Sequence, residues 1–239
     1  MVATGQHGGE VAAGILAATV RDNPRAVLGV ATGSTPLSTW SALARERLDL
    51  SRVRAFALDE YVGLPAGHPQ SYASVVRREI VRPLGLDPSR VRVPDGGAGD
   101  LAEAAADFER ELQDVGGVQV QVLGIGANGH IAFNEPGSPH DSLTRVERLS
   151  EQTRWDNARF FGELAVVPQQ CVTQGIGTIL RARSLVLLAY GERKARALSR
   201  ALDGPIDVSC PASALQLHDD VTVIADTAAA SLLKNRAPG

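Results

Sequence analysis

The sequence repeats one pattern: a short apolar run, a turn rich in glycine or polar residues, and a stretch with helical periodicity. The apolar runs lie at residues 26–31, 53–58, 90–93, 118–125, 185–190 and 221–225. Helical stretches lie at residues 36–48, 101–115 and 191–202, and a last helix is expected after residue 225. Strands that alternate with helices pair in parallel through right-handed crossovers. The pattern predicts an α/β fold with a doubly wound, mostly parallel, Rossmann-like sheet, helices on both faces, and a single domain over residues 1–239.

Composition excludes several classes of protein. The chain has 239 residues, of which 44% are hydrophobic and 21% charged, so it can bury a sizeable core. A net charge of -3 argues against a nucleic-acid partner. No apolar run approaches the roughly 20 residues that span a bilayer, and residues 1–11 do not resemble a secretory signal. Cys171 and Cys210 lie far apart, which favours a reducing compartment. We therefore expect a cytoplasmic protein without membrane contact, and leave a homo-oligomer open.

Ligands of doubly wound sheets bind outside the carboxyl ends of the strands. The polar segments that follow the runs at 26–31, 53–58, 118–125 and 185–190 should therefore converge on one crevice.

The first of these segments is a glycine turn that opens a helix. Gly33, Ser34 and Thr35 would offer backbone N–H groups, hydroxyl groups and a helix N-terminus to an anion. Thr35 is expected to cap the helix, with Pro36 at the first helical position. The spacing matches neither of the common nucleotide-binding glycine motifs, and an ordinary capped turn is the alternative.

The second segment carries the adjacent carboxylates of Asp59 and Glu60. Successive side chains of a strand point to opposite faces, so only one of the two should enter the crevice. Asp59 is the candidate general base, and a solvated acidic turn is the alternative.

The third segment, residues 124–137, contains several glycines and a histidine between polar side chains. His130 titrates near neutrality, and Glu135 could fix its tautomer and raise its basicity. Asn128 is the third candidate of this loop. The five histidines show no metal-ligand spacing, so no metal is expected.

Two basic residues complete the set of candidates. Lys194 lies in the first turn of a helix, where the dipole does not favour a cation, so an anion in the crevice would explain its position. Arg159 is a second candidate for an anion. A surface arginine or an ion pair is the alternative for Arg159, as it is for Arg145 and Arg154.

Together these segments resemble the glucosamine-6-phosphate deaminase family. The matching stretches are ATGSTPLSTW, LDEYVGLPAGHPQSY, LGIGANGHIAFNEPGS, NARFF, TQGIGTIL, GERKARAL and PASALQLH followed by VTVIAD. They occur in the order of the family and span residues 28–226, and DEYVG followed by NGHIAFNEPG is the most specific part.

The resemblance implies a small-molecule sugar-phosphate substrate: glucosamine 6-phosphate and water would become fructose 6-phosphate and ammonia, without metal or organic cofactor. Asp59 matches the base that moves a proton between C2 and C1. His130 matches the residue that opens the sugar ring, assisted by the matches of Glu135 and Asn128. The residues that match phosphate-binding positions are Gly33, Ser34, Thr35, Arg159 and Lys194.

Two departures from the family pattern carry expectations. Some members have Asp where this chain has Asn128, and an amide can orient His130 but cannot stabilise an imidazolium by charge, so an altered pH dependence is expected. Allosterically activated members hold a second sugar phosphate with basic residues just after the loop. Here Arg145 matches but Glu147 replaces a basic residue. Activation by N-acetylglucosamine 6-phosphate should therefore be weak or absent. Residues 145–169 are a candidate lid.

Three other interpretations stay open. The 6-phosphogluconolactonases share the fold, but they have DER where this chain has Asp59, Glu60 and Tyr61, and they lack FNEPG. A galactosamine-6-phosphate deaminase differs by the preference at C4, which these motifs do not reveal. A sugar-phosphate-binding domain of a regulator would need a DNA-binding segment, and the stretch before residue 26 is too short for one.

Overall fold

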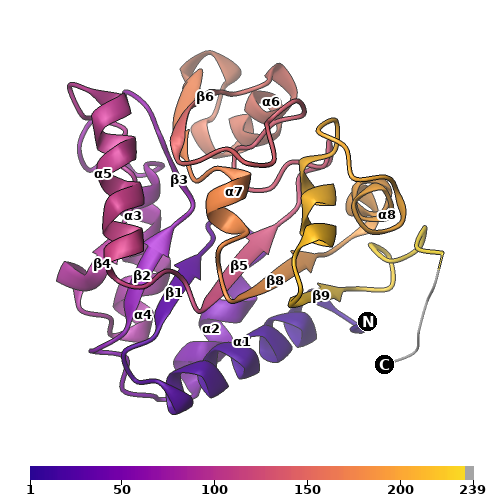
Figure 1. Cartoon of the computed structure of the whole chain (residues 1–239), viewed down its shortest axis with the longest axis horizontal. Coiled ribbons are helices and arrows are strands. Elements are labelled where there is room, and N and C mark those ends of the chain that lie inside the picture. Colours follow the sequence, from indigo (N-terminus) through magenta and orange to yellow (C-terminus); the bar gives the residue numbers. More distant parts are fainter. Residues whose placement is uncertain (235–239) are drawn as a thin grey trace.

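Six parallel strands form the main sheet, in the order β4-β2-β1-β5-β8-β9 (Figure 1). The structure is a computed structural model and describes residues 1–234. The strands are β1 (Val27–Val30), β2 (Arg54–Ala57), β4 (Val91–Arg92), β5 (Val120–Gly124), β8 (Ser184–Ala189) and β9 (Val221–Ala225). Each falls within one predicted apolar run or differs from it by one residue at an end, which confirms the parallel α/β sheet.

The strand order makes the sheet doubly wound. From β1 in the middle the chain adds β2 and β4 on one side, then returns to place β5, β8 and β9 on the other side. The winding direction reverses between β1 and β5, and a crevice forms outside the carboxyl ends of the two strands at such a point. β1 is wholly buried, because helices cover both faces of the sheet.

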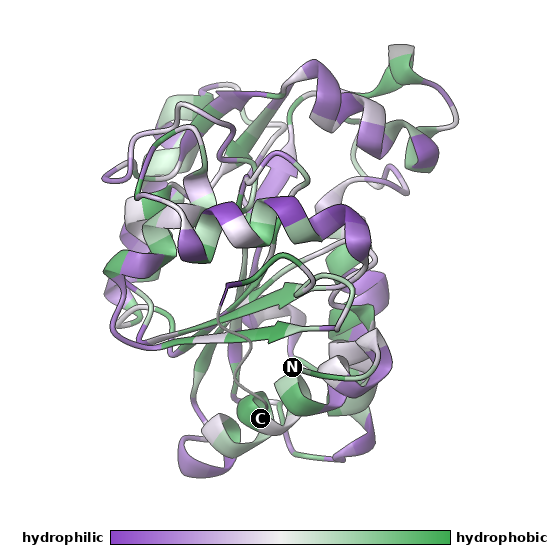
Figure 2. Cartoon of the chain, turned by 90° about the vertical axis from the view of Figure 1, so that its right-hand side faces the viewer, coloured by the Kyte–Doolittle hydropathy of each residue, from purple (hydrophilic) through white to green (hydrophobic). Residues whose placement is uncertain are grey.

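Helices lie on both sides of the strands, and the apolar strands appear between them when the molecule is viewed from the side (Figure 2). The α-helices are α1 (Gly5–Asp22), α2 (Leu37–Arg45), α3 (Tyr72–Val76), α4 (Arg82–Leu84), α5 (Leu101–Asp114), α6 (Glu151–Phe161), α7 (Ile176–Ile179) and α8 (Ala195–Asp203). A π-helical turn (Arg77–Val81) joins α3 to α4, and short 3-10 helices cover Pro88–Arg90, Leu164–Val166, Glu192–Lys194 and Pro211–Leu217.

Helix α1 was not expected from the sequence, because glycine weakens an isolated helix and this one contains several. Its glycines allow close packing instead. A Cβ at Gly8 would lie 2.4 Å from the hydroxyl oxygen of Tyr190, and one at Gly9 would lie 2.6 Å from the carbonyl carbon of Ser38. Thr4 caps the helix, whose buried face packs against α2. Tertiary packing therefore outweighs helix propensity here.

A second, antiparallel sheet was not expected either. It consists of β3 (Asp59–Tyr61), β7 (Gln170–Thr173) and β6 (Arg145–Arg148), in that order. Only Leu58 separates the end of β2 from the start of β3, so the chain passes directly from the main sheet into the small one. With α6, the small sheet forms the end of the molecule beyond the carboxyl ends of the main strands (Figure 1). Most of the expected lid, residues 145–169, is thus regular structure.

Two local expectations were wrong. Pro36 occupies the N-cap of α2, not its first helical position, and no side chain caps this helix. The last helix expected after residue 225 is absent from the described part of the chain, since residues 227–232 form turns. The helix expected from residue 191 is confirmed, although it begins as the 3-10 turn Glu192–Lys194. Within residues 1–234, no helix combines the length and apolar character needed to cross a membrane.

Candidate active site

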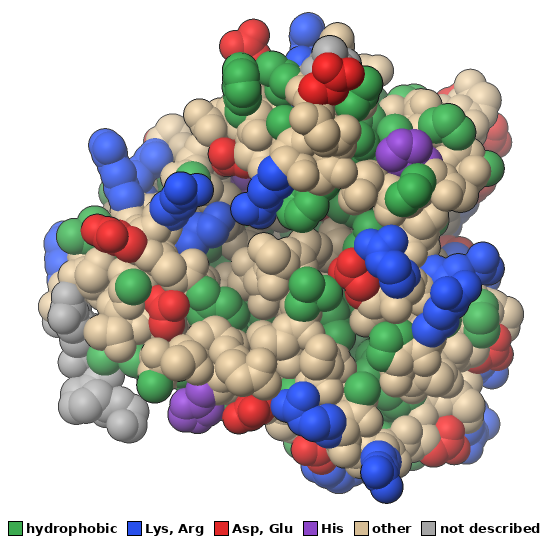
Figure 3. Space-filling model, turned by 180° about the vertical axis from the view of Figure 1, so that it is seen from behind, with side chains coloured by type: hydrophobic (Ala, Val, Ile, Leu, Met, Phe, Trp, Pro, Cys, Tyr) green, Lys and Arg blue, Asp and Glu red, His purple; other side chains and the backbone are tan. Residues whose placement is uncertain are grey.

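A cavity of about 380 Å³ opens where the strand order reverses. Its walls come from the segment after β1, from Leu58, Asp59 and Tyr61, from the loop after β5, from α6, and from Lys194 after β8. In the view from behind, basic side chains gather around a hollow in the surface (Figure 3). The expected convergence of four distant segments on one crevice is confirmed.

The five candidate phosphate-binding residues all line this cavity. Gly33 has a φ of 91°, a left-handed conformation that favours glycine, and its turn leads into the N-terminus of α2. Backbone N–H groups, two hydroxyl groups and a helix N-terminus therefore meet at one wall. Lys194 and Arg159 supply positive charge from two other segments. Burial lowers the pKa of Lys194, Asp156 opposes this shift, and Arg159 adds to it.

The arginines near α6 have different surroundings. Arg159 is exposed at the cavity, with its guanidinium 4.7 Å from the ring centroid of Phe160. Arg154 instead donates to the carbonyl groups of Leu164 and Val167. Of these two arginines, only Arg159 is placed to meet an anion in the cavity.

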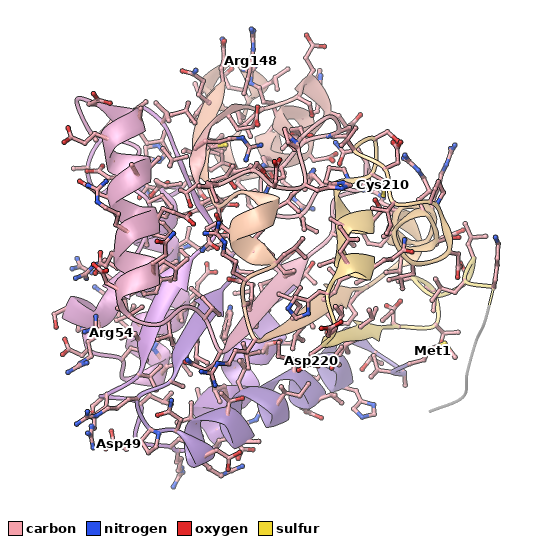
Figure 4. The ribbon with its side chains drawn as sticks, viewed as in Figure 1. Met1, Asp49, Arg54, Arg148, Cys210 and Asp220 are labelled. Carbon is pink, nitrogen blue, oxygen red and sulfur yellow. The ribbon has the colours of Figure 1, made fainter. Side chains whose placement is uncertain are left out.

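Arg145 lies in β6 and is engaged within the protein. It donates to Asn134 Oδ1 at 2.9 Å and to Ser138 Oγ at 3.1 Å, and it forms an ion pair with Glu147 at 2.6 Å. At the outer end of β6, Arg148 points away from the body of the protein (Figure 4).

Asp59 and Glu60 point in opposite directions, as the strand geometry predicts. Asp59 lines the cavity and is only 7% exposed. Burial, aided by the charge of Glu60, raises the pKa of Asp59 from 3.8 to about 8. Glu60 accepts three backbone N–H groups at 2.8 Å, from Tyr61, Tyr72 and Ala73, and so fixes the start of α3. One carboxylate is available for chemistry and the other has a structural role.

Two glycines shape the loop that carries His130. A Cβ at Gly126 would lie 2.3 Å from Cε1 of the His130 ring, so only glycine lets the ring lie against this backbone. Gly129 has a φ of 94°, and a Cβ there would lie 2.8 Å from the Sγ of Cys210 (labelled in Figure 4). Close contacts with His130 and Cys210 therefore explain why this loop has glycine at positions 126 and 129.

Hydrogen bonds inside this loop hold Glu135 beside His130. Asn128 Nδ2 donates to Glu135 Oε2 at 2.8 Å, and Asn128 Oδ1 accepts the backbone N–H of His130 at 3.1 Å. The backbone N–H of Ser150 donates to the other carboxylate oxygen of Glu135 at 3.1 Å. Asn128 therefore orients Glu135 and the backbone of His130, whereas an effect on the imidazole ring was expected.

The imidazole is partly buried and close to a carboxylate. Nδ1 of His130 lies 3.8 Å from Glu135 Oε2 and has no hydrogen-bond partner within residues 1–234. Burial lowers the pKa of His130, although Glu135 opposes the shift. Burial alone would raise the pKa of Glu135, but hydrogen bonds from Thr153, Ser150 and Asn128, together with His130, lower it. A neutral imidazole thus faces an ionised carboxylate near pH 7.

Sequence reasoning did not identify the aromatic wall of the cavity. Tyr61 packs against Tyr72, Phe133 and Phe161 with ring centroids 4.9, 5.5 and 5.4 Å apart. All four line the cavity. The signal was present, because each of them lies within a stretch quoted for the family resemblance. Asp156 and Asn157 of α6 also line the cavity and had not been assigned a role.

Comparison with known proteins identifies the family. Residues 3–224 match the model of the glucosamine-6-phosphate isomerases/6-phosphogluconolactonase family, so the chain belongs to this family of sugar-phosphate enzymes. It is 55% identical over 229 residues to the glucosamine-6-phosphate deaminase of Cutibacterium acnes, covering 94% of this chain and 88% of that one. It is 52% identical over 239 residues to the deaminase of Streptomyces coelicolor, covering 98% and 92%.

Two solved structures share the fold of this chain at different levels of sequence identity. A monomeric glucosamine-6-phosphate deaminase superposes with a TM-score of 0.94 at 42% identity, covering 97% of this chain and 98% of that one. The 6-phosphogluconolactonase of Trypanosoma brucei superposes with a TM-score of 0.79 at 21% identity, covering 96% and 95%. The second likeness shows a shared fold alone.

Proposed function

We propose that this chain is a glucosamine-6-phosphate deaminase, which converts glucosamine 6-phosphate and water to fructose 6-phosphate and ammonia. The observation that carries the proposal is one cavity lined by the buried carboxyl group of Asp59, by His130 with Glu135 behind it, and by a glycine turn and two cations suited to an anion. Relatives at about half identity over nearly the whole chain bear the same activity in their names.

The first step is ring opening, which moves a proton from the C1 hydroxyl group to the ring oxygen. A neutral imidazole can accept the proton of the C1 hydroxyl group and donate it to the ring oxygen. The lowered pKa of His130 suits this role, because it keeps the imidazole neutral. Glu135 stabilises the transient imidazolium by its charge at 3.8 Å. Asn128 is a positioning residue, because it acts on Glu135.

The second step is proton transfer between C2 and C1. Asp59 takes the proton from C2 while the oxygen at C1 gains a proton from the ammonium group of the substrate, which gives a neutral enolamine. Asp59 then returns its proton to C1, which gives the protonated ketose imine. Water then adds at C2, and the C–N bond breaks to release ammonia. A raised pKa makes Asp59 a stronger base once it is ionised, and the ammonium group of the substrate favours the ionised form.

The anion-binding end would hold the phosphate group. A sugar phosphate carries close to two negative charges. The protein has a net charge of -3, so its overall charge does not attract such a substrate. The turn at Gly33, Ser34 and Thr35, together with Arg159 and Lys194, would supply local attraction. Such an anchor fixes C1 and C2 beside Asp59 and lowers the barrier through orientation.

Three further points belong to the proposal. Residues 145–169 act as a lid, since α6 contributes Thr153, Arg159 and Phe161 to the cavity wall.

One chain supplies every proposed catalytic group, so the chemistry does not need a second copy. The reaction is assigned to the cytoplasm, because both cysteines are free and buried, and a charged sugar phosphate does not cross a bilayer unaided.

Ammonia release tests the proposal. The purified chain should release ammonia from glucosamine 6-phosphate faster than from galactosamine 6-phosphate, and it should not hydrolyse 6-phosphogluconolactone. Faster deamination of the galactosamine substrate would reassign the C4 preference. Lactone hydrolysis without ammonia release would place the chain in the other branch of the family.

A further inference from the structure

A carboxylate also lines the cavity that holds the two proposed phosphate-binding cations. Lys194 and Arg159 are the cations already described, and Asp156 lines the same cavity. Asp156 and Arg159 are three residues apart in α6, so they project from the same side of the helix. A carboxylate beside the cations of an anion site opposes its ligand, and the mechanism above gives Asp156 no role.

The charge of Asp156 reaches both halves of the site. Burial lowers the pKa of Lys194 and of His130, and the charge of Asp156 opposes both shifts, as the smallest contribution for His130. Gln152 Nε2 donates to Asp156 Oδ1 at 3.0 Å, which holds the carboxylate in place. The amide is neutral, so it leaves the charge of the carboxylate uncancelled.

We propose that Asp156 determines the affinity of the site, as a built-in competitor of the substrate phosphate for the positive field of Lys194 and Arg159. In the empty cavity its carboxylate offsets part of that field, and a bound phosphate dianion meets its repulsion. Asp156 thereby weakens the hold on phosphate groups and speeds release of a phosphorylated product. This inference takes the identity of the substrate from the proposed function. The binding of phosphate itself can be tested without it.

The test is the affinity of the whole chain for inorganic phosphate, measured by calorimetry at low salt. Asp156→Asn keeps the hydrogen-bonding shape and removes the charge. We expect its dissociation constant for phosphate to fall by about 3- to 5-fold, the size of an exposed charge pair. The gain should shrink as salt is added. The KM for glucosamine 6-phosphate should fall by a similar factor without a rise in kcat.

Two variants serve as controls. Glu151→Gln removes the same charge from the same helix, and Glu151 is exposed and absent from the described cavity lining. Its phosphate affinity should match that of the natural protein. Asp156→Glu keeps the charge and should bind phosphate as the natural protein does.

Phosphate binding that is unchanged in Asp156→Asn would overturn the inference, and so would weaker binding, which would mean that Asp156 assists the ligand. An equal gain in Glu151→Gln would also overturn it, since the effect would then be one of overall charge. Because phosphate binding needs no turnover, a chain that releases no ammonia would refute the proposed function and leave this comparison intact.

Discussion

Replacing Asp59 by asparagine should abolish deamination and stabilise the protein. The pKa of Asp59 is raised from 3.8 to about 8 by burial and by Glu60, so folding places a carboxyl group where its ionised form is unfavourable. Between these two pH values the folded chain keeps a proton that the unfolded chain has lost. The contribution of Asp59 to the free energy of unfolding therefore decreases as pH rises, up to about pH 8.

The magnitude follows from the pKa difference. Each unit between 3.8 and the working pH costs about 1.4 kcal/mol, so Asp59 costs at most about 4 kcal/mol at pH 7. The amide in Asp59→Asn does not titrate, so the advantage of this variant should grow by up to about 3 kcal/mol between pH 5 and pH 7 and level off above pH 8. Other titrating groups cancel in the comparison of the two proteins.

Urea unfolding at several pH values measures this difference directly. Glu60→Gln is the matched control, because its carboxylate accepts three backbone N–H groups and a single amide oxygen cannot replace both carboxylate oxygens. That variant should lose about 1–3 kcal/mol of stability. A stability difference between natural protein and Asp59→Asn that does not change with pH would refute the reasoning about burial.

Four other outcomes are expected. The kcat/KM for glucosamine 6-phosphate should rise with pH towards about 8 as free Asp59 ionises, and a pH profile flat from 6 to 8 would contradict this. Lys194→Ala should raise KM and the inhibition constant of inorganic phosphate by about 10- to 100-fold and change kcat little, whereas a fall in kcat alone would exclude a phosphate role. Gly126→Ala should lower kcat by more than about 10-fold in steady-state assays, since its Cβ would displace the ring of His130. Gly99→Ala, which has open space around its Cβ and lies outside the described cavity lining, should stay active. N-acetylglucosamine 6-phosphate should not lower the KM for substrate, because Arg145 is paired with Glu147, and a clear activator-dependent shift would contradict that.

The parallel sheet and the position of its site could be predicted from the sequence, because both follow from local patterns. Each main strand is a short apolar run, and the carboxyl ends of parallel strands meet at one edge. Strand alternation predicts that only one of Asp59 and Glu60 enters the crevice, and Asp59 is favoured because it is the first to leave the sheet. The substrate could not be obtained in this way and came from the resemblance to a family.

What sequence reasoning missed depends on contacts between distant residues. α1 is built around glycines that fit against Tyr190 and Ser38, and no local pattern reports those partners. The strands of the small sheet are three or four residues long, and β3 pairs with β7 more than a hundred residues later. Asp156 looks like a solvated helix residue until the fold places it beside Lys194.

The central claim is that one sheltered carboxyl group moves the proton from C2 to C1. Its most direct test is the deuterium content at C1 of fructose 6-phosphate formed from glucosamine 6-phosphate in D₂O during a single turnover. Because Asp59 is only 7% exposed, we predict clearly less than one deuterium per product molecule, with protium carried over from C2. A full deuterium at C1 in every molecule would contradict the account, since the proton would then have reached solvent between the two carbons.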